Sequence, residues 1–160
     1  MRLASIAVVV STAALMGCQP STRLTPQQEN VQRQILGDRM NEWVQSVNNN
    51  QVDAAIAMYI ADESLTLVQT DGSRGFGAEA AGSLRDFMAN LSFINVVPQN
   101  PNFDLLDANT AVITFRFSVD AILLDTTRDP FAGQGTMVWV MDPSDNLWKI
   151  HTQHLSRNPM

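Results

Sequence analysis

Residues Thr110 to Leu123, TAVITFRFSVDAIL, contain a strict alternation of apolar and polar side chains from Ile113 to Asp120. Successive side chains of a β-strand point to opposite faces, so this pattern predicts a long strand with one face on a core and the other toward solvent. One face carries Ile113, Phe115, Phe117 and Val119, and the other carries Thr114, Arg116, Ser118 and Asp120. A strand with two such different faces needs partner strands and a covering layer.

Three helices are expected before most of the sheet. Thr25 is a suitable N-cap before Pro26, and Gln28 can close a capping box, so the first helix should begin there and end at Asn48-Asn49-Asn50. Its apolar stripe is expected to be Val31, Ile35, Met40, Trp43, Val44 and Val47. A second helix is predicted from Val52 to about Ile60, and a third over residues 78–91, with Leu84, Phe87, Met88 and Leu91 on one side.

Further strands are predicted over residues 64–69, 92–97, 135–142 and 147–156, with PQNP at 98–101 as a connection. Helices first and a run of strands afterwards favour an α+β fold with N-terminal helices packed on a curved antiparallel β-sheet. A chain of 160 residues is long enough for one domain. Its net charge of −6 argues against a nucleic-acid partner, because the surface would repel phosphates.

The first residues, MRLASIAVVVSTAALMGC, combine one early positive charge with an apolar run, which predicts an export signal over residues 1–17. Leu15 to Cys18 resembles the lipobox of bacterial lipoproteins. The resemblance implies cleavage before Cys18, acylation of its thiol with chains such as palmitate, and a tether over residues 18–25 before a domain at 26–160. The protein would then sit in the bacterial cell envelope, lipid-anchored to a membrane and facing the periplasm or the exterior. In the alternative, Cys18 is incidental and cleavage occurs elsewhere.

Four features occur in a characteristic order: Trp43 in the first helix, VDAAIAMYIADESL, GFGAEAAGSLRDFM, and the final GQGTMVWVMDPSDNLWKIHTQHLS. Together they resemble the SnoaL-like branch of the nuclear transport factor two-like superfamily, over roughly residues 28 to 156. The resemblance implies a cone-shaped fold with an internal cavity.

The last predicted strand places Trp148, Ile150, Thr152, His154 and Ser156 on one face if alternation is unbroken. We therefore expect His154 to point into the cavity and His151 to be exposed. The expected pocket would hold a small apolar or amphipathic ligand, and its predicted lining is Trp43, Tyr59, Phe87, Phe115, Phe117, Trp139 and His154.

An enzymatic function is the alternative to ligand binding. Alignment with the related ketosteroid isomerases puts Trp43 at their tyrosine position and Val68 at their general base, which disfavours that reaction. Isomerase- or hydrolase-like acid–base chemistry would instead use His154 with a cavity carboxylate or Tyr59. The other polar candidates are Asp62, Glu63, Arg116, Asp120 and Arg128.

No spacing of metal ligands and no cofactor motif occurs in the sequence, so neither a metal nor a cofactor is expected. A homodimer is a further possibility, in which Arg116, Asp120 and Lys149 would serve the interface.

Overall fold

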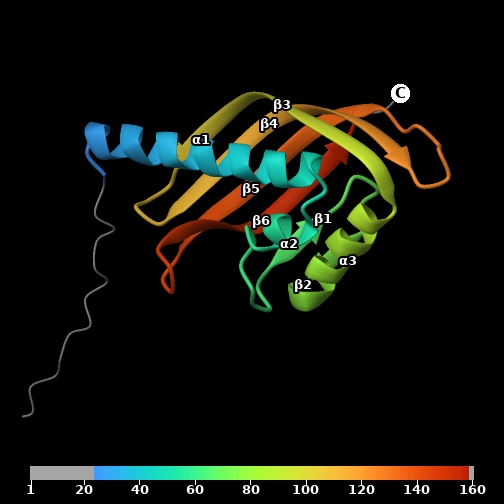
Figure 1. The fold of residues 1–160 in the computed structure, drawn as a ribbon. Coiled ribbons are helices and arrows are strands. Elements are labelled where there is room, and N and C mark those ends of the chain that lie inside the picture. The colour runs from blue at the N-terminus through green and yellow to red at the C-terminus, as the bar shows by residue number, and fades with distance from the viewer. Residues whose placement is uncertain (1–23, 159–160) are drawn as a thin grey trace, which may run out of the picture.

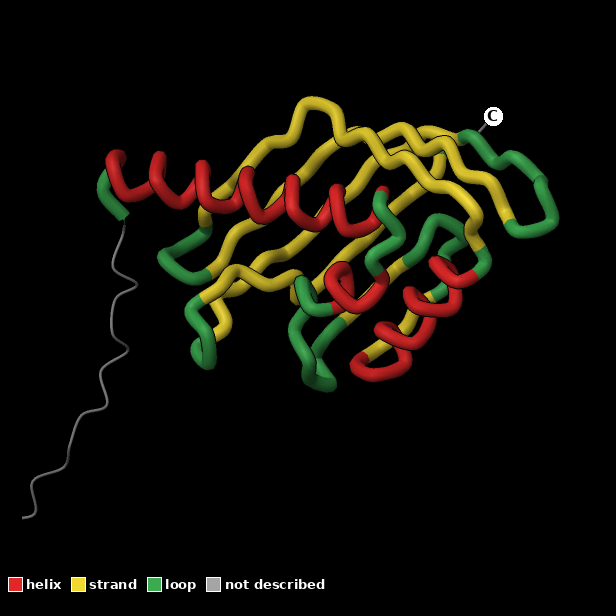
Figure 2. Tube along the Cα trace, in the orientation of Figure 1, coloured by secondary structure: helices red, strands yellow, loops and turns green. Residues whose placement is uncertain are grey.

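The computed structural model describes residues 24–158, so the export signal over residues 1–17 and Cys18 lie outside the described residues. The fold is a cone-shaped α+β domain in which the helices lie against a curved six-stranded sheet (Figures 1 and 2). The helices are α1 (Pro26–Asn48), α2 (Val52–Ile56) and α3 (Gly77–Ala89). Between residues 24 and 158, none of them combines the length and the apolar character that a membrane-spanning segment requires.

The strands are β1 (Thr66–Val68), β2 (Arg74–Phe76), β3 (Leu91–Leu105), β4 (Thr110–Leu123), β5 (Phe131–Asp142) and β6 (Leu147–Arg157). Their order in the sheet is β2-β1-β6-β5-β4-β3, and the four long strands pair antiparallel, as predicted. The sheet is nevertheless mixed, because β1 pairs parallel with β6.

Helix α1 begins where the sequence predicts. The Thr25 hydroxyl accepts a hydrogen bond from Gln28 N, and the Gln28 side chain accepts one from Thr25 N, so the capping box is present. The buried apolar face differs from the predicted stripe in its first turns, because Ile35 is 40% exposed while Leu36 is fully buried.

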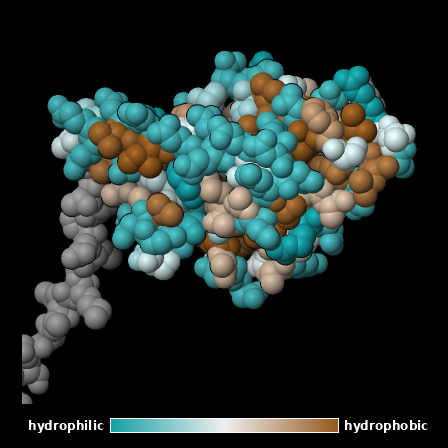
Figure 3. All heavy atoms as spheres, in the orientation of Figure 1, coloured by the Kyte–Doolittle hydropathy of each residue, from teal (hydrophilic) through white to brown (hydrophobic). Residues whose placement is uncertain are grey.

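The inward positions of α1 are Leu36, Met40, Trp43 and Val47, which repeat every three or four residues. Each residue advances the helix by about 100°, so Ile35 lies at the flank of this face. Val31 is also exposed, and apolar side chains lie at the surface over the N-terminal half of α1 (brown in Figure 3).

Helix α2 is shorter than predicted because the chain after Ile56 joins the sheet. Ile60 N donates to Ile150 O, and Ile150 N donates to Met58 O, so Tyr59 forms a bridge beside Ile150 of β6. Backbone groups engaged by β6 cannot also continue a helix. The bridge holds Tyr59 in the interior, where 4% of its surface is exposed.

Strand β3 also differs from the prediction, since PQNP does not end it. The strand continues to Leu105 through an irregularity between Gln99 and Asn102, where Asn100 has a φ of 50°. Proline has no backbone N–H group to donate to a neighbouring strand. Strand β3 is an edge strand with β4 as its one neighbour, so proline is tolerated in it. Strand β4 matches the prediction, with Ile113, Phe115 and Phe117 buried.

Candidate ligand-binding cavity

A cavity of about 170 Å³ lies inside the cone, between α1, α3 and the concave face of the sheet. Its buried lining is Trp43, Val47, Leu67, Met88, Ile94, Val96, Phe115, Phe117, Val119 and Gln153. Its more exposed lining, which forms the rim, is Gln69, Thr70, Leu84, Phe87, Asp129, Phe131, Leu155 and Arg157. An enclosed apolar space of ~150 Å³ is sufficient for benzene, so this cavity suits a compound with one ring.

Two glycines of β5 leave room for the aromatic wall. Gly135 pairs with Phe115 and Gly133 with Phe117, and all four residues are buried. A Cβ atom added to Gly135 would overlap the Phe115 ring, whose Cε2 would lie 2.7 Å from the added carbon. The centroids of the Phe115 and Phe117 rings are 6.1 Å apart, and Phe131 meets Phe117 edge to face at 6.0 Å. The missing β5 side chains thus let these rings lie close to the sheet.

A chain of buried hydrogen bonds crosses the interior. Trp43 Nε1 donates to the Tyr59 hydroxyl at 2.9 Å, and that hydroxyl donates to Gln153 Oε1 at 2.7 Å. Burial raises the pKa of Tyr59 well above its usual range, and the hydrogen bond from Trp43 lowers it by less. Tyr59 is therefore a neutral hydrogen-bonding group at physiological pH. Of these three residues, Trp43 and Gln153 line the cavity.

The charged groups of the lining form a pair at the rim. Arg157 Nη2 lies 2.6 Å from Asp129 Oδ2, and the Arg157 guanidinium lies 4.0 Å from the centroid of the Phe131 ring. Both charged side chains are partly exposed. They are the only titratable residues among those that line the cavity in the described part of the chain.

Four of the seven predicted pocket residues, Trp43, Phe87, Phe115 and Phe117, line the cavity. The other three do not, and each is a correction to the predicted lining: Tyr59, Trp139 and His154. Tyr59 is linked to the cavity wall through its hydrogen bonds with two lining residues, Trp43 and Gln153.

Trp139 is fully buried in the core, and its Nε1 is the one enclosed side-chain polar atom without a hydrogen-bond partner between residues 24 and 158. His154 is exposed. The prediction that His154 points into the cavity is wrong.

A bulge in β6 is the physical reason for the error at His154. Trp139 pairs with Ile150 and Val138 pairs with Thr152, so His151 is an extra residue without a partner in β5. An extra residue reverses which face the following side chains occupy. Trp148 and Ile150 point inward as predicted, but beyond the bulge the inward residues are Gln153, Leu155 and Arg157. His151 is half-buried rather than exposed.

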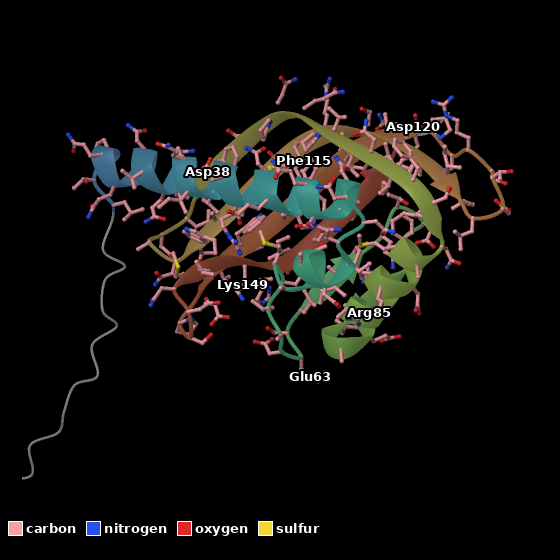
Figure 4. The ribbon with its side chains drawn as sticks, in the orientation of Figure 1. Asp38, Glu63, Arg85, Phe115, Asp120 and Lys149 are labelled. Atoms are coloured by element: carbon pink, nitrogen blue, oxygen red, sulfur yellow. The ribbon has the colours of Figure 1, made fainter. Side chains whose placement is uncertain are left out.

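The remaining polar candidates do not line the cavity. Arg116 is exposed, and Asp120 forms two hydrogen bonds with Arg128, from Nε at 2.9 Å and from Nη2 at 2.7 Å. Asp62 accepts hydrogen bonds from the backbone and hydroxyl of Ser64 in a turn, and Glu63 is exposed. Figure 4 shows Asp120 and Glu63 at the periphery, away from Phe115 on the sheet.

Lining residues that were not predicted include Asp129, Gln153 and Arg157, and the two glycines beneath the aromatic wall, Gly133 and Gly135, were not predicted either. One signal was available for the glycines, because Gly133 and Gly135 are spaced by two, like Phe115 and Phe117. Within residues 24–158, no three His, Cys, Asp or Glu side chains gather closely enough to hold a metal ion.

No protein-family model and no curated protein sequence matches this chain. Solved structures do resemble it. A nuclear transport factor 2-like superfamily protein from Salmonella enterica serovar Typhimurium superposes with a TM-score of 0.75 and 17% identity, covering 82% of this chain and 94% of that one.

Two further structures come from Novosphingobium species. A candidate scytalone dehydratase from N. aromaticivorans has a TM-score of 0.75, 12% identity, and coverage of 84% of this chain and 89% of its own. A hexachlorocyclohexane dehydrochlorinase from N. barchaimii has a TM-score of 0.69, 14% identity, and coverage of 84% and 92%. These similarities establish the nuclear transport factor 2-like cone fold for this chain.

Proposed function

We propose that this chain is a bacterial envelope lipoprotein whose cone domain, of the SnoaL-like branch, binds a small and largely apolar ligand. The observation that carries the binding proposal is the cavity of about 170 Å³, whose buried lining is apolar except for the amide of Gln153. Mostly apolar walls with a few placed polar groups are typical of small-molecule sites. The similar dehydrochlorinase acts on hexachlorocyclohexane, a ring compound, which supports a one-ring ligand here.

Binding is favoured over catalysis because the cavity offers little for acid–base chemistry. Elimination or isomerisation requires a general base within hydrogen-bond reach of the abstracted proton. His154, the predicted base, is on the exposed face, and the carboxylate of the lining, Asp129, is paired with Arg157 at the rim. Tyr59, with a raised pKa, is a poor base at neutral pH.

The experiment titrates purified protein with toluene and isopropylbenzene while following tryptophan fluorescence and the thermal midpoint Tm. Trp43 lies in the cavity wall, so its emission should change as the site fills. Ligand at 100 times its Kd should stabilise the fold by about 2.7 kcal/mol, which raises Tm.

A matched pair of variants on β3 provides the control. Val96 lines the cavity and is 8% exposed, whereas its neighbour Val97 is 43% exposed and does not line it. Val96→Phe should fill the cavity and abolish saturable binding, while Val97→Phe should bind like the wild type. An unchanged response in Val96→Phe would contradict binding in the cone, and turnover of any probe would favour the enzymatic alternative.

A further inference from the structure

The hydrogen-bond chain of Trp43, Tyr59 and Gln153 determines which end of the Gln153 amide meets the cavity. The three side chains come from α1, the segment after α2, and β6, and are 4%, 4% and 7% exposed. They join through bonds of 2.9 Å and 2.7 Å. Three separate segments of the fold therefore each hold one side chain of this hydrogen-bond network in place.

The direction of donation follows from chemistry. An indole N–H can only donate, so the Tyr59 oxygen is the acceptor of the bond from Trp43. The single hydroxyl proton of Tyr59 remains to be paired, and it is donated to the carbonyl oxygen of Gln153 at 2.7 Å. An amide N–H at that position would leave the buried hydroxyl proton without an acceptor. The network thereby assigns the orientation of the amide. The Nε2 group of Gln153 is directed away from Tyr59.

That Nε2 group has no hydrogen-bond partner among residues 24–158, in which Gln153 appears only as the acceptor from Tyr59. It is also not enclosed, because the one fully enclosed unpaired side-chain atom of that region is Trp139 Nε1. Gln153 is 93% buried and lines the cavity, so the accessible Nε2 faces the cavity. The apolar interior thus contains one oriented donor with two N–H bonds.

We propose that Gln153 is the polar anchor of the ligand and selects a neutral one-ring compound that carries a hydrogen-bond acceptor, such as a ketone or another carbonyl compound. This inference rests on the proposed binding function and deepens it. A ligand without an acceptor would leave the amide unpaired. A hydroxyl ligand would bring a donor whose one side-chain acceptor in the buried lining is the Gln153 oxygen, which already accepts from Tyr59. A carboxylate would lose its hydration without a cation in the interior, because Arg157 is at the rim and is paired with Asp129.

The test compares acetophenone with isopropylbenzene, which has nearly the same shape but no acceptor. The quantity measured is the ratio of their dissociation constants, because it cancels changes that affect both compounds equally. Gln153→Met keeps a similar side-chain length and removes the donor. It should weaken acetophenone binding relative to isopropylbenzene by about tenfold. Gln134→Met makes the same chemical change on the exposed face of β5 and should leave the ratio unchanged.

A second measurement uses the wild-type protein and does not depend on the folding of a variant. The side-chain NH₂ resonances of Gln153 should shift downfield in nitrogen–proton NMR spectra when acetophenone saturates the site, but not with isopropylbenzene. An unchanged affinity ratio in folded Gln153→Met would overturn the proposal that Gln153 anchors the ligand. NH₂ resonances of Gln153 that do not shift when acetophenone is bound would overturn it as well. Failure of both compounds to bind wild-type protein would instead overturn the proposed binding function itself.

Discussion

At the scale of single residues, the cavity depends on the glycines of β5, which have no side chain, as much as on the residues that line it. Gly135 faces inward beneath the ring of Phe115, and neither residue could keep its place if the glycine carried a side chain. Glycine is required at position 135 for steric reasons and not for its backbone conformation, since Gly135 is not among the residues with positive φ in residues 24–158. One small residue thereby sets the position of a large one.

Gly135→Ala should lower the free energy of unfolding by about 1–3 kcal/mol, because the buried Phe115 ring must move off the added methyl group. The ring can move into the cavity, so ligand affinity should fall as well. Chemical denaturation measures the first effect and fluorescence titration the second.

Gly82→Ala is the matched control. Gly82 lies within α3, and nothing would lie within 4 Å of an added Cβ atom. Alanine should therefore stabilise this helix by about 0.5–1 kcal/mol. Equal effects of the two substitutions would contradict the steric role of Gly135.

At the scale of elements, β6 decides which residues the cavity contains. The strand begins with Trp148 and Ile150 inward, passes through the unpaired His151, and continues with Gln153 inward and His154 outward. The bulge lies close to the bridge that Tyr59 makes with Ile150 and to the start of the parallel pairing with β1. Three chain segments meet there, and the same place supplies both partners of the Tyr59 to Gln153 bond.

Cysteine substitution tests the reversal of faces, because the natural chain has one cysteine, Cys18, which can be replaced by serine. In that background, His154→Cys should react rapidly with a thiol reagent, and Gln153→Cys should react at least about tenfold more slowly because a buried thiol is inert. Timed modification followed by mass spectrometry gives both rates. A strand without the bulge would reverse the order, and that outcome would refute the assigned register.

At the scale of the whole molecule, the cone and the N-terminal segment have separate proposed roles. Helix α1 begins at Pro26, eight residues after Cys18, so the proposed anchor would be joined to the domain by a short tether. The domain has its own core and covers the cavity with α1 and α3. Ligand binding should therefore not require the anchor.

We expect mature protein from bacterial membranes to begin at Cys18 and to carry acyl chains. Each buried methylene contributes about 0.8 kcal/mol, so several chains are sufficient to hold the domain at a membrane. Intact-mass analysis measures the modification, and membrane fractionation measures the anchoring. Cys18→Ala should lose both the acyl modification and the membrane anchoring, whereas a Cys18→Ala protein that remained processed and membrane-bound would exclude the lipobox interpretation.

The sequence by itself determined the features that depend on local periodicity and capping. Thr25 and Gln28 predicted the start of α1, and the alternation within the segment from Thr110 to Leu123 predicted the faces of β4, because these patterns act between residues near in the chain. The same patterns led to the α+β class and to the aromatic part of the cavity wall, with Trp43, Phe115 and Phe117.

Only the tertiary structure decided the polar part of the cavity. The extra residue at His151 appears only when β6 is paired with β5, and it exchanges His154 for Gln153 on the inner face. The shortening of α2 likewise depends on hydrogen bonds to Ile150, more than ninety positions further along the chain. The sequence of one strand does not specify its register with the neighbouring strand. Alternation along one segment therefore identifies two faces, but it cannot show where a bulge against the neighbour exchanges them.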